Sequence, residues 1–141
     1  DDVVTLELDY DPSIPKIKAD PEQLIQAMLN IVRNAMQSLA SPDIDHHLGK
    51  ILLRTRVLRN VTVRSEFHRL AVSIEVIDNG PGIPPKLMDT MFYPMISGRT
   101  DGTGLGLSIT HAIISQHHGL IECESKTGDT CFTVVLPILD S

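Results

Sequence analysis

The spacing of apolar residues divides the chain into strand-like stretches with a period of two and helix-like stretches with a period of about 3.6. The run 70–77 alternates most clearly, with one face made of Leu70, Val72, Ile74 and Val76. The five predicted strands are residues 3–10, 51–58, 70–77, 119–125 and 130–137. We expect 51–58 and 70–77 to pair antiparallel, with the polar segment 59–69 forming an exposed excursion longer than a tight hairpin. The last two strands should form a hairpin around Gly128-Asp129.

The longest predicted helix has a clear start and a clear end. Asp20 suits the N-cap, Pro21 the first helical position and Gln23 the capping-box position. The helix should run to about Leu39, before Ser41-Pro42. Its expected buried face consists of Leu24, Met28, Ile31, Val32, Ala35, Met36 and Leu39.

Two further helices are predicted in the second half of the chain. A short one lies within 83–92, with proline in its first turn. A loop without a clear period, 93–101, leads into a third helix that ends at His117-His118-Gly119. The third helix is indicated by residues three or four apart, namely Leu105, Ile109, Ala112, Ile113 and Gln116.

Composition narrows the class of protein. At 141 residues, with 42% hydrophobic and 21% charged positions, the chain is expected to be one globular domain. It has no membrane-length apolar run and no signal-peptide pattern, and the net charge of −6 argues against nucleic-acid binding. Cys123 and Cys131 have opposite strand parity if Cys131 faces Lys126, so we expect reduced thiols and a cytoplasmic protein. The chain opens without Met, so we expect an excised piece of a longer protein.

The polar face of the first predicted helix consists only of amides. Residues three or four apart line up as Gln23, Gln26, Asn30, Asn34 and Gln37. An ordinary solvated face would mix Glu with Lys, and an Asn oxygen is a neutral ligand suited to Mg²⁺. A neutral helix face packed under a loop explains the pattern equally well. Both interpretations remain open at this point.

Two glycine clusters suggest a ligand site. The turn Asp78-Asn79-Gly80-Pro81-Gly82 ends a strand, and alone it is typical of a surface Asx-turn. Four further glycines, at 98, 102, 104 and 106, precede the third helix, and a glycine-rich loop at a helix N-terminus favours phosphate. The cluster lacks the Gly-Lys-Ser/Thr of a Walker loop, and its third glycine falls one position early for a Rossmann motif.

The order of these motifs resembles one superfamily. The helix with Asn30 and Asn34, the Asp78 turn, Phe92 and the 102–107 stretch resemble the N, first G, F and second G boxes of a shared ATP-binding domain. Sensor histidine kinases, Hsp90 chaperones, type II topoisomerases and MutL repair proteins have this domain. The resemblance covers residues 3–137 and implies an α+β, Bergerat-type two-layer sandwich. In it a mixed, mostly antiparallel sheet of about five strands is covered on one face by about three helices.

Position 30 distinguishes branches of the superfamily. In the chaperones and topoisomerases a Glu one turn before the metal-binding Asn activates water, but Asn30 cannot accept a proton. The resemblance therefore implies a protein-histidine kinase that binds ATP and Mg²⁺ and reserves the γ-phosphoryl for a histidine on a separate domain. The alternatives are a conformational ATPase of the Hsp90, MutL or topoisomerase type and an anti-sigma-type serine kinase.

A finer resemblance points to nitrogen-regulation sensor kinases of the NtrB type, through Phe92-Tyr93-Pro94-Met95-Ile96-Ser97-Gly98-Arg99 and Asn34-Ala35-Met36-Gln37. It implies an NtrC-type response regulator, a PII-type regulator and a homodimeric parent, with this piece monomeric. Many kinases have Lys where Gln37 stands, so Arg33 or Arg99 would supply the positive charge. No phosphoacceptor motif is present, so the dimerisation domain is expected to lie outside residues 1–141.

The resemblance also implies a role for each motif residue. Asp78 accepts a hydrogen bond from the adenine amine, Gly82 allows close approach of the purine, and Thr130 places a hydroxyl near the adenine. Asn30 and Asn34 are the implied Mg²⁺ ligands and, with Arg99, the implied catalytic residues, while 93–101 is the implied lid. The full implied ATP-binding set is Asn30, Arg33, Asn34, Gln37, Asp78, Gly80, Gly82, Ile83, Phe92, Ser97, Arg99, Gly102, Thr103, Gly104, Leu105, Gly106, Leu107 and Thr130.

Overall fold

A computed structural model describes residues 4–40, 49–92 and 103–139. These ranges contain five strands, β1 (Thr5–Asp9), β2 (Lys50–Val63), β3 (Glu66–Asp78), β4 (Leu120–Lys126) and β5 (Asp129–Pro137). They also contain three helices, α1 (Pro21–Leu39), α2 (Pro85–Thr90) and α3 (Thr103–Gln116). No helix in the described ranges combines the length and the apolar character that crossing a membrane requires.

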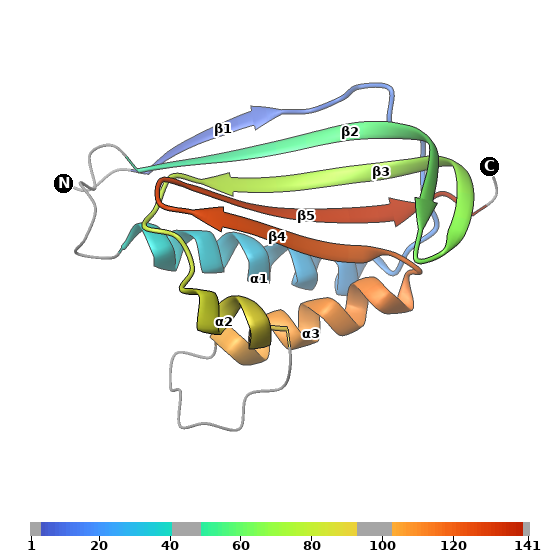
Figure 1. Ribbon diagram of the computed structural model, residues 1–141. Coiled ribbons are helices and arrows are strands. Elements are labelled where there is room, and N and C mark those ends of the chain that lie inside the picture. The colour runs from blue at the N-terminus through green and yellow to red at the C-terminus, as the bar shows by residue number, and fades with distance from the viewer. Residues whose placement is uncertain (1–3, 41–48, 93–102, 140–141) are drawn as a thin grey trace.

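The strands form a single sheet, and the helices lie on one side of it (Figure 1). The strand order is β1-β2-β3-β5-β4, in which only the β1–β2 pair is parallel. The last strand within the described ranges, β5, therefore lies between two others. This arrangement confirms the predicted α+β fold with a mixed, mostly antiparallel sheet.

Helix α1 has the predicted bounds. Its N-cap carboxylate, Asp20 Oδ1, accepts hydrogen bonds from the amides of Glu22 and Gln23, at 3.1 and 3.2 Å. The predicted buried face was wrong at Met36, which is 47% exposed, while Ala27 is fully buried. The cause is α3, whose Thr110 hydroxyl donates to the Ala27 carbonyl at 3.5 Å, since only a small side chain permits such a close helix crossing.

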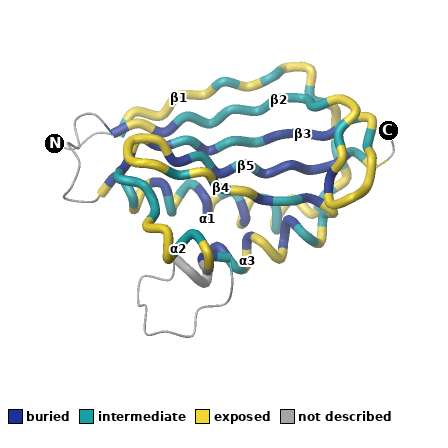
Figure 2. Tube along the Cα trace, in the orientation of Figure 1, coloured by how far each residue is buried: buried dark blue, intermediate teal, exposed yellow. Residues whose placement is uncertain are grey.

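Helix α3 also packs differently from its predicted period. Its buried residues are Leu107, Thr110, Ile113 and Ile114, whereas Ile109 and Ala112 are exposed. The helix begins at Thr103, so Gly104 and Gly106 lie within its first turns instead of in a loop before it. The main core combines the inner faces of α1 and α3 with alternate residues of the sheet (Figure 2).

The predicted excursion at 59–69 is wrong, because β2 and β3 continue to a tight turn at Arg64 and Ser65. Both turn residues have positive φ, 51° and 72°, as in a two-residue type I′ hairpin. Asn60 also has a positive φ of 52°, which interrupts the alternation of β2. Beyond this kink, the hairpin tip closes a second apolar cluster with Val63, Ala71 and Val135. Val135 alternates with core residues of β5, so this cluster lies on the sheet face opposite the helices.

The β4–β5 turn is one residue earlier than predicted. Lys126 pairs with Asp129, so the turn residues are Thr127 and Gly128, and Cys131 pairs with Glu124 instead of Lys126. Cys123 pairs with Phe132, so the two thiols still lie on opposite faces, and both are free as predicted. Burial raises the pKa of the Cys123 thiol to about 12.

Candidate functional site

Asp78 is the last residue of β3, and its carboxyl group is buried, with a relative exposure of 2%. Its Oδ1 accepts a hydrogen bond from the Gly80 amide at 2.9 Å, and the Ser38 hydroxyl from α1 also bonds to it. Burial raises the pKa of Asp78, and these two hydrogen bonds oppose the rise. The carboxyl is thus held in one orientation at the end of the strand.

A chain of hydroxyl groups continues from Asp78 across the sheet. Thr130, 2% exposed, is the β5 partner of Asp78 and also pairs with Ser125 on β4. The Ser125 Oγ lies 2.7 Å from Thr130 Oγ1 and accepts from the Ile83 amide at 2.8 Å. Sequence reasoning missed Ser38 and Ser125. Ser38 lies one helical turn beyond Asn34, so the helical spacing indicates it. Ser125 lies across from Thr130, so the correct strand register would have indicated it.

The turn after Asp78 lies against the β4–β5 hairpin. The Gly128 amide donates to the Gly80 carbonyl at 2.8 Å. Gly82 has φ of +93°, and a Cβ there would lie 3.1 Å from the Lys126 carbonyl carbon and oxygen. At Gly80 a Cβ would meet the Ser38 hydroxyl. Both glycines are therefore required by close contacts within the protein itself, apart from any ligand.

The polar face of α1 leads to this turn. Asn30 and Asn34 are half-buried and one turn apart, and Ser38 follows one turn later beside Asp78. Gln37 and Arg33 are exposed. The amide face is therefore continuous with the Asp78 turn and ends at the same edge of the sheet.

Phe92 and Leu107 are apolar members of the predicted set, and both pack inward. The Phe92 ring lies 5.8 Å from the His111 ring and makes an edge contact with Phe132 at 6.3 Å between centroids. Leu107 is 3% exposed, within the main core. These side chains hold α2 and α3 against the sheet, so the first turns of α3 begin near the same edge (Figure 1).

The other residues of the predicted set fall into three groups. The first group lies around β3 and the β4–β5 hairpin, where Asp78 accepts from Gly80 and pairs with Thr130, and Ser125 links Ile83 to Thr130. Gly82 belongs to the same turn. Those at the start of α3, Thr103, Gly104, Leu105 and Gly106, are helical. Ser97, Arg99, Gly102 and the whole predicted lid, 93–101, lie outside the described residues. Among the described residues, no His, Cys, Asp or Glu group could hold a metal ion.

Comparisons with a family model and with named relatives indicate the same protein family. Residues 19–140 match the family described as histidine kinase-, DNA gyrase B-, and HSP90-like ATPase. Proteins named sensory histidine kinase/phosphatase NtrB are similar, at 53% identity in Vibrio alginolyticus and 55% in Escherichia coli O157:H7. These alignments cover 96% and 97% of this chain but only 38% of each relative.

Solved structures show the same fold. The catalytic domain of histidine kinase ThkA matches with a TM-score of 0.75 and 27% identity, covering 96% of this chain and 79% of that one. Full-length ShkA, solved in complex with AMPPNP, matches with a TM-score of 0.71 and 24% identity, covering 95% of this chain and 25% of that one. At that identity the second match speaks for the fold alone.

Proposed function

Since the chain belongs to the histidine kinase-, DNA gyrase B- and HSP90-like ATPase family, we propose that residues 1–141 form the catalytic ATP-binding domain of a sensor histidine kinase. The observation that carries the proposal is the buried Asp78 carboxyl, held by Ser38 and Gly80. A buried carboxylate at the end of a strand needs a donor, and the exocyclic amine of adenine is one. Guanine presents a carbonyl oxygen at the same ring position, so Asp78 would select adenine.

The amide face of α1 fits the other end of the nucleotide. Asn30 and Asn34 lie one turn apart, and their neutral oxygens suit Mg²⁺, which when bound would neutralise phosphate charge. Neither amide can take a proton from water, so hydrolysis lacks a base at positions 30 and 34. The γ-phosphoryl is then kept for an incoming imidazole. Arg33, Gln37 and Arg99 remain the proposed neighbours of the phosphates.

The wider context is a two-component system for nitrogen regulation. The relatives named NtrB, at 51–56% identity in seven of the comparisons, support this assignment. The chain spans about two fifths of their length, 38% in most cases, so the parent's activity extends beyond these residues. We propose a homodimeric parent that supplies the phosphoacceptor histidine, an NtrC-type response regulator and a PII-type regulator as partners.

Calorimetry and phosphoryl labelling of the 141-residue chain test this function. We expect binding of ATP with Mg²⁺, very slow hydrolysis and no self-labelling. Addition of the phosphoacceptor domain from an NtrB relative should produce labelling of its histidine. Rapid hydrolysis by the chain alone would instead indicate a conformational ATPase, and labelling of a serine on a partner would indicate the serine-kinase branch.

A further inference from the structure

The arginines of the β2–β3 hairpin differ in whether a partner neutralises them. Arg54 and Arg56 both pair with Asp9, and Arg54 also lies 3.6 Å from Glu75. The hairpin has three further arginines, Arg59, Arg64 and Arg69, and none has a carboxylate partner among residues 4–40, 49–92 and 103–139. Arg64 instead donates to the Ser115 carbonyl at 3.1 Å. Arg59 and Arg69 therefore carry positive charge that no carboxylate of the described residues neutralises, on a chain whose net charge is −6.

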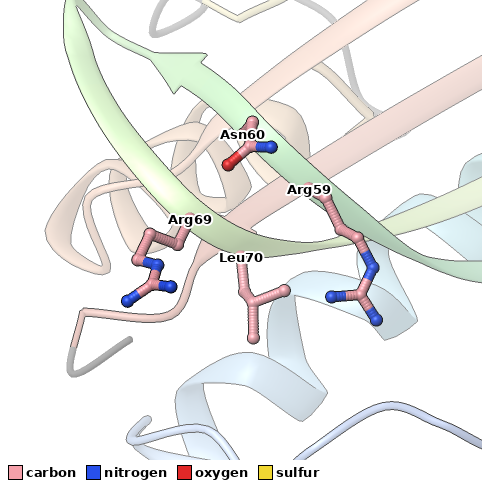
Figure 3. A pocket seen from close by; sticks show the side chains of 4 residues that line it. All are labelled: Arg59, Asn60, Arg69 and Leu70. Atoms are coloured by element: carbon pink, nitrogen blue, oxygen red, sulfur yellow. The ribbon is translucent and has the colours of Figure 1, made fainter.

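These two arginines line a cavity of about 400 Å³ together with Asn60 and Leu70 (Figure 3). In Figure 3 the Leu70 side chain lies between the two arginines, with one guanidinium group on each side of it. Leu70 is the cross-strand partner of Arg59, and its carbonyl accepts from the Ile138 amide at 3.0 Å. The floor of the cavity is therefore fixed to β2 on one side and to the residue that follows β5 on the other.

The kink at Asn60 gives the cavity its shape. Arg59 pairs with Leu70 and Val61 with His68, but the intervening Asn60 and Arg69 are absent from the ladder. The positive φ of Asn60, 52°, turns the backbone at the point where these two residues leave the ladder. Such a conformation is uncommon outside glycine, although Asn tolerates it better than most residues.

We propose that this cavity binds a short dicarboxylate, with Arg59 and Arg69 each holding one carboxylate and Leu70 contacting the methylene groups between them. A guanidinium presents two parallel N–H donors that match a carboxylate, and the volume is within the usual range for small ligands. A dianion also relieves the repulsion between the two arginines. The site lies eight residues from Asp78 along β3, about 26 Å at about 3.3 Å per residue, so it is separate from the proposed nucleotide site.

NMR titration of the 141-residue chain with succinate, glutarate and adipate, at constant ionic strength, tests this site. We expect saturable shifts of the Arg59, Arg69 and Leu70 amides. Arg59→Gln and Arg69→Gln should each raise the Kd of the best dicarboxylate about tenfold or more. Arg59→Lys retains the charge but loses the two parallel N–H donors of the guanidinium group, and should also weaken binding.

Matched controls separate this site from general attraction of anions. Arg54→Gln removes the same charge from the same strand but from a paired arginine, and should leave the Kd unchanged. Butyrate and inorganic phosphate, which lack the second carboxylate or the apolar spacer, should bind more weakly. Absence of saturable shifts, equal weakening by Arg54→Gln, or equal affinity for butyrate would each overturn the proposal.

Discussion

Replacing Asp78 with Asn tests separately how much stability the buried charge costs and whether the carboxylate binds adenine. Burial raises the pKa of Asp78 above its ordinary value of 3.8, so folding favours the neutral form. Stability therefore falls as pH rises from 3.8 to the folded-state pKa, the full penalty applies above that pKa, and it is absent below 3.8. Asn is neutral at every pH and nearly isosteric, so Asp78→Asn should raise the free energy of unfolding at pH 7.

The internal contacts of the variant should persist. The Asn oxygen can still accept from the Gly80 amide, now 2.9 Å from Oδ1, and the Ser38 hydroxyl can turn to accept from the new NH₂ group. The new NH₂ group is a donor, however, and it would face the exocyclic amine of adenine, which is also a donor, so this hydrogen bond is lost. A hydrogen bond to a charged group contributes about 1.5–3 kcal/mol, so ATP affinity should fall about 10- to 150-fold or more.

Two measurements check the Asp78→Asn reasoning. Urea unfolding at pH 7 and pH 4 should show a stability gain that shrinks at the lower pH, and calorimetry at pH 7 should show the loss of ATP affinity. Glu122→Gln, an exposed position on β4, removes the same charge and should change neither property. Unchanged ATP affinity in Asp78→Asn would refute the adenine assignment, and a stability gain independent of pH would refute the burial argument.

Three further predictions concern contacts described above. Gly82 has φ +93° and is crowded by the β4 backbone, so Gly82→Ala should lower the free energy of unfolding in urea by about 1–3 kcal/mol. Gly128 has φ +85° but lies in open space, so Gly128→Ala should lower it by less. His117 accepts at Nε2 from the Asp20 amide at 3.0 Å, so His117→Ala should cost about 1 kcal/mol by the same assay; an unchanged midpoint would contradict this. Cys123, with its pKa of about 12, should react with iodoacetamide at pH 8 far more slowly in the folded than in the urea-unfolded chain; equal rates would exclude the burial effect.

Local signals in the sequence predicted most of the fold. Helix α1 was located correctly because Asp20 and Pro21 are strong start signals that need no tertiary context. The β2–β3 turn was missed because Arg64 and Ser65 adopt positive φ without the Asn or Gly that usually indicates a type I′ turn. Tertiary packing in the apolar cluster around Val63 offsets the cost of that conformation.

Contacts between elements were harder to predict. The burial of Ala27 and the exposure of Met36 depend on where α3 crosses α1, which periodicity along α1 cannot specify. Likewise Ser38 and Ser125 contact the Asp78 turn only because a helix and a hairpin meet there. Resemblance supplied the motif residues of the candidate site, and the residues that hold those motifs in position came from the fold.

The position of β5 inside the sheet affects how the chain can be synthesised and folded. β4 is hydrogen-bonded only to β5, and β3 has β5 as its second neighbour, so neither edge is covered until Asp129–Pro137 is available. On the ribosome, a nascent chain that has emerged through β4 still exposes both strand edges, which are prone to pairing with other chains. Asp78 likewise has no Thr130 beside it at that stage. Closure of the sheet and formation of the adenine end of the proposed site are therefore a single event, which requires the complete β4–β5 hairpin.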